Sequence, residues 1–201
     1  MVRYLGPKLR ILKTLGVSFL PGFSSKHITK LSKPILNKTH YFYCLKEKQK
    51  LRFNYGLSNK YIKKYINKLK LQQGIISLNL LKLLEMRLDS ILFRVGFWKS
   101  INQSKQFINH GHIFVNKILI QSNNFNVKVN DIIYVKYNKS IYNLIKSNLK
   151  SYFQYLKNIQ TNFLQFQICI LSYKIKILRP INSRDIIFKI NNLLFLENYK
   201  V

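Results

Sequence analysis

Negative charge is almost absent from this chain, and that scarcity limits what it can fold into. Six Asp and Glu residues face 35 Lys and Arg residues, so the formal net charge of the 201 residues is +29. Repulsion of this size destabilises a compact free chain, and a polyanionic partner is the simplest compensation. Yet 47% of the residues are hydrophobic, with 13 Tyr and 14 Phe, which excludes a disordered polycation. We therefore expect a folded protein that binds a polyanion.

The polyanion is either a nucleic acid or an anionic membrane surface. Apolar runs such as IISLNLLKLL are interrupted by polar residues, and Lys8, Arg10 and Lys13 break up the N-terminal stretch. Neither a membrane-spanning helix nor a signal peptide is therefore predicted. Cys44 and Cys169 have no metal-type spacing and suggest no disulfide framework. We expect a nucleic-acid-binding protein without a metal, a cofactor or a membrane partner.

The composition also carries information about the genome. Alanine is absent and 28 Lys stand against 7 Arg, although alanine is the best helix former. Alanine codons are GC-rich, whereas the abundant Lys, Asn, Ile, Tyr and Phe can all be written in A and T. An extremely AT-rich genome, such as that of a reduced organelle or a parasite, accounts for this bias.

The first half of the chain is predicted to be helical after an irregular arm with a short helix near 8–15. Between 46 and 72, Ser58 is an N-cap residue and apolar side chains recur at helical spacing from Tyr61 to Leu69. The opposite face is nearly all lysine: Lys60, Lys63, Lys64, Lys68 and Lys70. Such a face is either a solvated surface or a phosphate-binding one, and the shortage of acids favours the second. Ser77 is then expected to cap one long helix that continues to Val95.

A small antiparallel sheet is predicted to follow a helix over 102–109. The apolar runs 113–115 and 118–120 flank Asn116-Lys117, which is the spacing of a two-residue hairpin. Further strands are expected at 132–136, 163–171, 174–178 and 193–197, with a helix over 139–157. The fold class is therefore α+β: a mostly helical N-terminal part, a helix–helix–hairpin module and C-terminal strands.

Catalysis is not expected. Glu85 and Asp89 lie four residues apart, where one helix would place both carboxylates on the same face. A paired-carboxylate site is one interpretation. Pairing with Arg87, Lys82 or a following helix cap is the favoured one, because no other acid or His is linked to them in sequence. Neither cysteine has an adjacent His as a base, and no glycine-rich phosphate loop is present.

The segment NHGHIFVN is the most distinctive polar motif. His110 and His112 could bind a metal, but no third ligand is near in sequence. A turn that places imidazoles beside phosphate or base, and a merely structural turn, are the other interpretations. If the helix and hairpin pack together, one surface would combine five further donors suited to the RNA backbone and the 2′-hydroxyl: Arg87, Arg94, Lys105, Gln106 and Lys117.

These residues resemble a known family. MRLDSILFRVGF followed by SKQFINHGHIFVN is similar to the RNA-binding module of small-subunit ribosomal protein S4. RYLGPKLRILKTLG, LPGFSSK, EKQKLRFNYGLS, NVKVNDIIYVK and LRPINSRDIIFKINNLLFLENY resemble the rest of that family, in order and in its plastid and cyanobacterial form. The resemblance implies four segments: a basic arm over 1–45, a helical rRNA-binding region over 46–85, the S4-type module over 86–150, and a C-terminal helix and strands over 151–201.

The resemblance also implies a function. A member of the family is a structural constituent of the small subunit that binds rRNA directly, nucleates assembly of the subunit body and, with protein S5, contributes to translational accuracy. The implied rRNA contacts come from both halves of the chain: Arg3, Lys8, Arg10, Lys13, Lys48, Lys50, Arg52, Tyr55, Arg87, Arg94, Ser100, Lys105, Gln106, His110, His112, Asn116 and Lys117. With the AT-driven composition, the plastid-like motifs suggest a relict plastid (apicoplast), with a mitochondrion or an AT-rich bacterium as alternatives.

The sequence departs from the family in three places, and two other functions have to be considered. Leu9 and Leu12 stand where some relatives have zinc-binding cysteines, so zinc is not expected. The basic loop before EKQKLRF is shortened. Lys117 replaces a common glycine, which predicts a hairpin turn that is either strained or of another type. An RNA-modifying enzyme would need a further catalytic domain. A small heat-shock ribosome-binding protein would not explain the matching arm and C-terminal segment.

Overall fold

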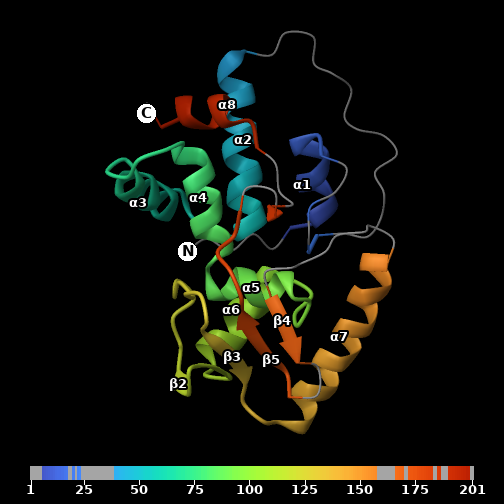
Figure 1. The fold of residues 1–201 in the computed structure, drawn as a ribbon. Helices are drawn as coiled ribbons and strands as arrows, with labels where there is room; N and C mark the ends of the chain where they lie inside the picture. The colour runs from blue at the N-terminus through green and yellow to red at the C-terminus, as the bar shows by residue number, and fades with distance from the viewer. Residues whose placement is uncertain are drawn as a thin grey trace. The chain divides into compact units, whose positions relative to one another are not determined.

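The computed structural model describes residues 6–17, 20, 22–23, 39–157, 166–169, 172–182, 185–186 and 190–199. The chain forms two compact units, Met1–Leu80 with Phe188–Val201 and Leu81–Ile187 (Figure 1). The four segments implied by the family resemblance remain a prediction.

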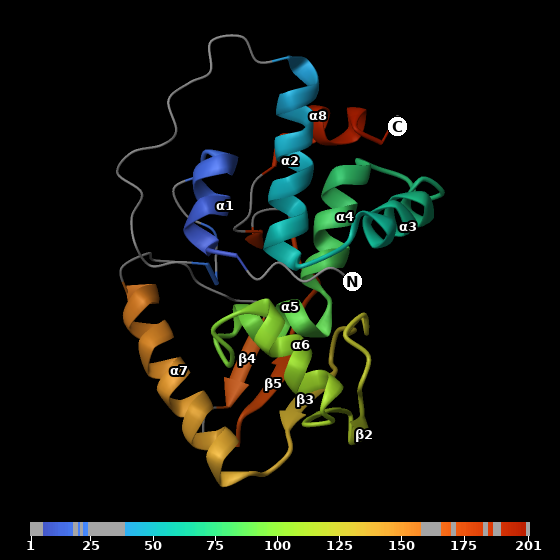
Figure 2. The same cartoon turned by 180° about the vertical axis from the view of Figure 1, so that it is seen from behind.

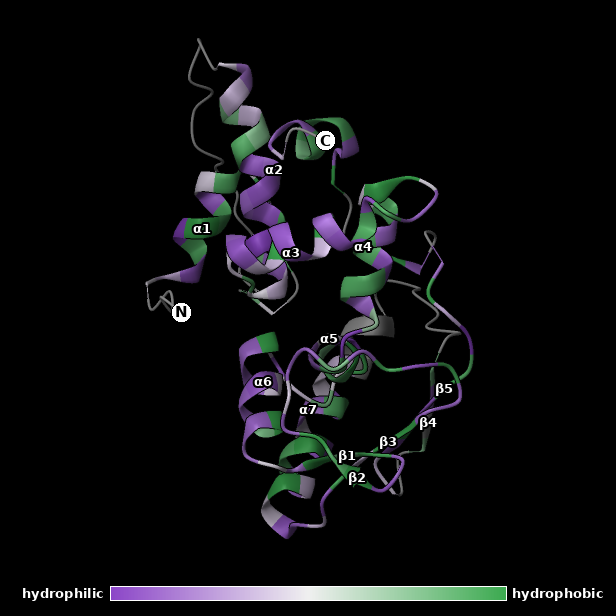
Figure 3. Cartoon of the chain, turned by 90° about the vertical axis from the view of Figure 1, so that its left-hand side faces the viewer, coloured by the Kyte–Doolittle hydropathy of each residue, from purple (hydrophilic) through white to green (hydrophobic). Residues whose placement is uncertain are grey.

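The first unit is helical. It contains α1 (Lys8–Leu15), α2 (His40–Tyr55), α3 (Asn59–Leu69), the start of α4 (Ile76–Glu85) and the short α8 (Asn192–Glu197). Its core includes Leu12, Leu51, Ile62, Ile66 and Phe195, all at most 1% exposed. In α3 the buried positions follow the predicted helical spacing, and polar residues cover the rest of the helix (Figure 3).

Two predictions for this unit are wrong. The helix expected from residue 46 begins at His40, within the segment predicted to be an irregular arm. The strand expected over 193–197 is the helix α8, because Asn191 caps it by accepting a hydrogen bond from the Leu194 N–H at 3.4 Å. Helix α8 lies beside α2, as Figure 1 and the reverse view in Figure 2 both show.

The second unit is built on a five-stranded antiparallel sheet in the order β2-β1-β3-β5-β4. The strands are β1 (Ile113–Val115), β2 (Ile118–Leu119), β3 (Ile132–Val135), β4 (Phe166–Cys169) and β5 (Lys174–Ile177). Three helices, α5 (Leu88–Arg94), α6 (Ile101–Asn109) and α7 (Lys139–Lys157), contribute apolar side chains to the same core as the sheet. The predicted α+β class, the hairpin, α6 and α7 are confirmed.

The prediction of one long helix over 77–95 is wrong, because the helix is interrupted between α4 and α5. Arg87 adopts an extended backbone (φ −73°, ψ 143°) and forms an isolated antiparallel bridge with Asn126. The Leu88 N–H donates to the Phe125 carbonyl at 2.9 Å, and the Val127 N–H donates to the Met86 carbonyl at 3.0 Å. Backbone pairing with a distant loop thus replaces the helical hydrogen bonds at this point.

Within the described ranges, no helix is both long enough and apolar enough to cross a membrane.

Candidate nucleic-acid interface

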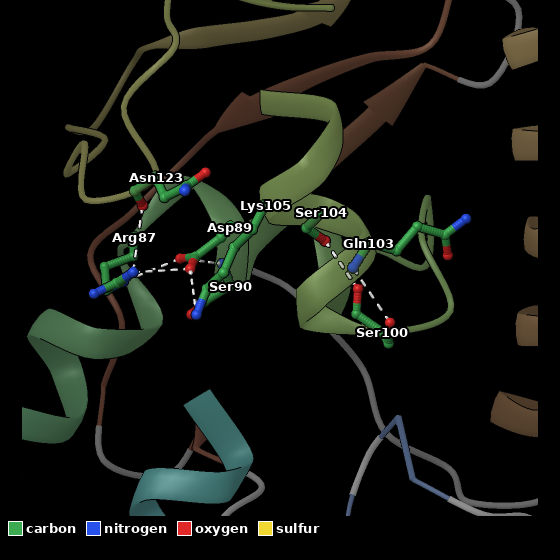
Figure 4. A network of polar contacts seen from close by, with 8 residues as sticks. All are labelled: Arg87, Asp89, Ser90, Ser100, Gln103, Ser104, Lys105 and Asn123. Carbon is green, nitrogen blue, oxygen red and sulfur yellow. Dashed lines mark hydrogen bonds and ion pairs between the residues drawn. The ribbon is translucent and has the colours of Figure 1, made fainter. Parts of the chain in front are cut away.

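A buried ion-pair network lies at the start of α5 (Figure 4). Arg87 donates from Nε and Nη2 to the two carboxylate oxygens of Asp89 at 3.0 and 2.8 Å, and each side chain is 1% exposed. The Ser90 N–H donates to the same carboxylate, and Arg87 Nη2 also reaches the Asn123 carbonyl at 3.4 Å. Lys105 Nζ, from α6, lies 3.7 Å from Asp89 Oδ2. The network therefore joins the break before α5 to α6 and to the 123–126 loop.

Burial also affects Lys105, whose side chain is 15% exposed. Loss of hydration lowers the pKa of Lys105, Asp89 partly restores it, and the positive charge of Arg87 lowers it further. Two of the cations assigned to nucleic acid, Arg87 and Lys105, thus face an internal carboxylate.

A second buried ion pair, between Arg94 and Glu85, accounts for the other carboxylate that the sequence predicted to lie near Asp89. Arg94 donates from Nε and Nη2 to Glu85 at 3.0 and 2.8 Å, with both side chains about 5–6% exposed. Because the helix is interrupted between Glu85 and Asp89, the two acids do not share a helical face as expected. Each pairs with its own arginine, so the ion-pair interpretation holds for both acids, and the partner of Glu85 is Arg94.

Two further predicted site residues, Ser100 and Asn116, form hydrogen bonds that stabilise the local fold. Ser100 caps α6 by accepting a hydrogen bond from the Gln103 N–H at 3.3 Å. The Asn116 amide donates to Asp131 Oδ1 at 2.7 Å and accepts from the Ile132 N–H at 2.9 Å, so it ties the hairpin turn to the start of β3.

Of the two alternatives expected for the hairpin turn, the structure shows the strained one. Asn116 and Lys117 have φ values of 49° and 71°, the left-handed conformation that a two-residue turn of this kind requires. Asparagine tolerates it, whereas lysine pays about 1–2 kcal/mol.

Replacing Lys117 by glycine is expected to raise the free energy of unfolding by about 0.5 kcal/mol, because relief of strain exceeds the greater backbone entropy of unfolded glycine. Urea unfolding followed by fluorescence measures the change. Asn116→Gly is the control and should lower stability, since it removes the contacts to Asp131 and Ile132. A loss of stability in Lys117→Gly would contradict the strain.

The exposed part of the predicted site lies at the end of α6 and along the hairpin. Gln106, His110 and Lys117 are exposed, and His112 is half-buried. The rings of His110 and His112 are 6.3 Å apart, and the His112 carbonyl accepts from the Lys136 N–H at 2.8 Å. Burial lowers the pKa of His112, and the neighbouring His110 and Lys136 lower it further.

That arrangement does not make a metal site at the two histidines. Among the described residues, no third Cys, Asp, Glu or His joins His110 and His112. The imidazoles therefore remain hydrogen-bonding groups at a basic surface.

The outer face of the sheet is a candidate binding surface that the sequence analysis did not identify. Phe114 and Tyr134 stack with ring centroids 5.2 Å apart, and Lys174 is the cross-strand neighbour of Tyr134. The alternation of lysine and isoleucine in KIKI was the available signal, since period-two patterning places Lys174 and Lys176 on one face. Aromatic rings beside lysines suit stacking on bases and contact with phosphates.

Predicted contacts in the first unit are partly exposed and partly buried. Arg3 lies outside the described residues. Arg10 and Lys13 are exposed on α1, and Lys8 Nζ donates to the Gly22 carbonyl at 3.1 Å. Tyr55 is 1% exposed and belongs to the core.

The remaining basic residues of this unit lie on α2 and α3. On α2, Lys48, Lys50 and Arg52 are half-buried, and Lys50 pairs with Glu47. The five lysines of the α3 face named above are all exposed.

Comparison with known proteins matches nearly the whole chain. Residues 3–85 match the family model described as the ribosomal protein S4/S9 N-terminal domain, and residues 86–133 match the S4 domain. The boundary between these matches falls at the break between α4 and α5.

Curated relatives match at full length. The small ribosomal subunit protein uS4c of Phaeodactylum tricornutum is 39% identical over 99% of this chain and 98% of its own length. The uS4 protein of Prochlorococcus marinus strain NATL2A and the uS4c protein of Gracilaria tenuistipitata are 38% and 39% identical, each with 99% of this chain and 98% of the relative covered. The chain belongs to the family of small ribosomal subunit protein uS4.

Proposed function

We propose that this protein binds small-subunit rRNA directly, as a structural component of a plastid ribosome. One observation supports the proposal most: all six carboxylates are engaged within the chain. Glu85 and Asp89 neutralise buried arginines, Glu47 pairs with Lys50, and Asp185 pairs with Arg179. Asp131 holds the hairpin turn, and Glu197 contacts His40. The exposed lysine faces are thus left for an external polyanion.

The rRNA-binding surface that we propose has two parts. In the first unit it consists of the basic residues of α1, the α3 lysine face and the half-buried Lys48, Lys50 and Arg52. In the second unit it consists of Gln106, His110, His112 and Lys117, with Lys174 and Lys176 on the sheet. Arg87, Arg94 and Tyr55 are too buried for direct contact, so their role is to position the surface. Ser100, Lys105 and Asn116 support it through α6 and the turn.

The finer role rests on family membership. The family is a structural ribosomal one and not a family of enzymes. We infer that the chain nucleates assembly of the subunit body and contributes, with protein S5, to decoding accuracy. The uS4c relatives support a plastid ribosome, and the AT-driven composition favours a relict plastid.

Binding to the 5′ domain of small-subunit rRNA should depend steeply on salt. If about eight phosphates are engaged, released counterions give a slope of log affinity against log salt of roughly −7. A filter-binding titration over several salt concentrations measures it, and footprinting should show protection confined to one multi-helix junction. A slope near zero, or equal affinity for an unrelated folded RNA, would overturn the proposal.

A further inference from the structure

Three potential metal ligands from the two ends of the chain meet beside α2. His40 and Cys44 lie one helical turn apart, so both side chains share a face of α2. Glu197, the last residue of α8, is 157 positions from His40, and its Oε2 lies 2.5 Å from His40 Nε2 and 3.3 Å from Cys44 Sγ. Cys44 Sγ lies 3.5 Å from His40 Nε2. The thiol, the imidazole and the carboxylate thus lie close enough together to contact one ion.

The spacing suits one tetrahedral ion. Zinc bonds of about 2.3 Å to sulfur and about 2.0–2.1 Å to nitrogen and oxygen place tetrahedral ligand atoms roughly 3.3–3.6 Å apart. Both distances from Cys44 Sγ already lie close to this range. Only the contact between His40 and Glu197 is too short, and their side chains are 68% and 52% exposed, so they can separate. The buried ligand is in place, and the adjustable ligands are at the surface.

The identity of the ligands selects the metal. Sulfur with imidazole favours zinc over magnesium or calcium, which prefer oxygen ligands alone.

We propose that His40, Cys44 and Glu197 bind one zinc ion, with water as the fourth ligand, and that this ion fastens α8 to α2. The site differs from the prediction of no metal, which rested on the spacing of the two cysteines, on the lack of a third ligand near His110 and His112, and on leucines at positions 9 and 12. The available signal was the His-x-x-x-Cys spacing of HYFYC, which places two ligands on one helical face. Glu197 could be added only by the fold.

Cobalt is the probe, because a bound thiolate gives a charge-transfer absorption band that aqueous cobalt lacks. Titration of the full-length chain in high-salt buffer is expected to show this band at one cobalt per chain, with loss of the band on addition of zinc. Cys44→Ser should abolish the band, and Glu197→Gln should weaken affinity at least about tenfold. Cys169→Ser is the matched control and should leave band and affinity unchanged.

Two outcomes would overturn the site: no charge-transfer band in the wild-type chain, or a band that survives Cys44→Ser and disappears in Cys169→Ser. Hydrogen exchange tests the fastening separately. Zinc should slow exchange of the α8 amides in the wild-type chain and not in Glu197→Gln, whose exposed position keeps the fold intact. Unchanged exchange in the wild-type chain would show that the ion does not hold α8.

Discussion

Replacing Asp89 by asparagine is expected to lower the free energy of unfolding of the second unit by about 3–5 kcal/mol. Asp89 accepts two hydrogen bonds from the buried Arg87 guanidinium and lies beside Lys105, so its neutralisation leaves two cations facing each other in a desolvated site. Urea unfolding followed by fluorescence measures the loss. Trp98 is the single tryptophan, is 1% exposed and lies in the core of this unit, so its signal reports on the relevant structure.

The control for this loss is Asp185→Asn, the same chemical change at a less buried pair. Asp185 binds Arg179, whose side chain is 35% exposed, and exposed pairs contribute about 0–1 kcal/mol. The double variant Arg87→Met with Asp89→Leu removes both charges and should recover much of the stability lost in Asp89→Asn. Equal losses in Asp89→Asn and Asp185→Asn would show that burial of the Arg87 pair is energetically unimportant.

Elements defined by local patterning could be predicted from the sequence. The hairpin follows from two apolar runs separated by Asn116-Lys117, and the helix predicted over 102–109 is α6, which ends before His110 and Gly111. The break at Met86 and Arg87 carries no such signal, since neither proline nor glycine is present there. It arises from backbone pairing with residues 125–127, and a contact over that distance overrides helical propensity.

The same break explains why two of the predicted RNA-binding residues are buried. A continuous helix would place Arg87 and Arg94 on the expected RNA-binding surface, although an ion pair with Arg87 was also expected for the two acids. Once the chain turns at Arg87, both guanidiniums face carboxylates inside the second unit. By contrast, His110 and Lys117 lie in turns, where local sequence decides exposure, and both are exposed as expected.

Replacing Gly96 by alanine is expected to destabilise the second unit by about 3 kcal/mol or more. Gly96 ends α5 with φ +86°, a conformation that costs a residue with a Cβ about 1–2 kcal/mol. In addition, a Cβ at Gly96 would lie 2.4 Å from Tyr152 Cδ1 and 3.0 Å from Tyr152 Cβ. The ring cannot simply swing away, because the Tyr152 hydroxyl donates to the Arg94 carbonyl at 2.5 Å. Thermal unfolding followed by Trp98 fluorescence measures the loss.

Gly111→Ala separates backbone strain from the clash. Gly111 has a similar φ of +73°, but its added Cβ would meet the flexible end of Gln121 at 3.3 Å and the Leu119 methyl groups at ordinary contact distances of 3.7 and 3.8 Å. The loss of stability in Gly111→Ala should therefore stay near the 1–2 kcal/mol that the left-handed conformation alone costs. In a Tyr152→Ala background the further cost of Gly96→Ala should fall to the same value, because the ring that obstructs the Cβ is gone. If Gly96→Ala costs no more than Gly111→Ala in the wild-type background, the packing of α7 against the end of α5 is looser than these distances require.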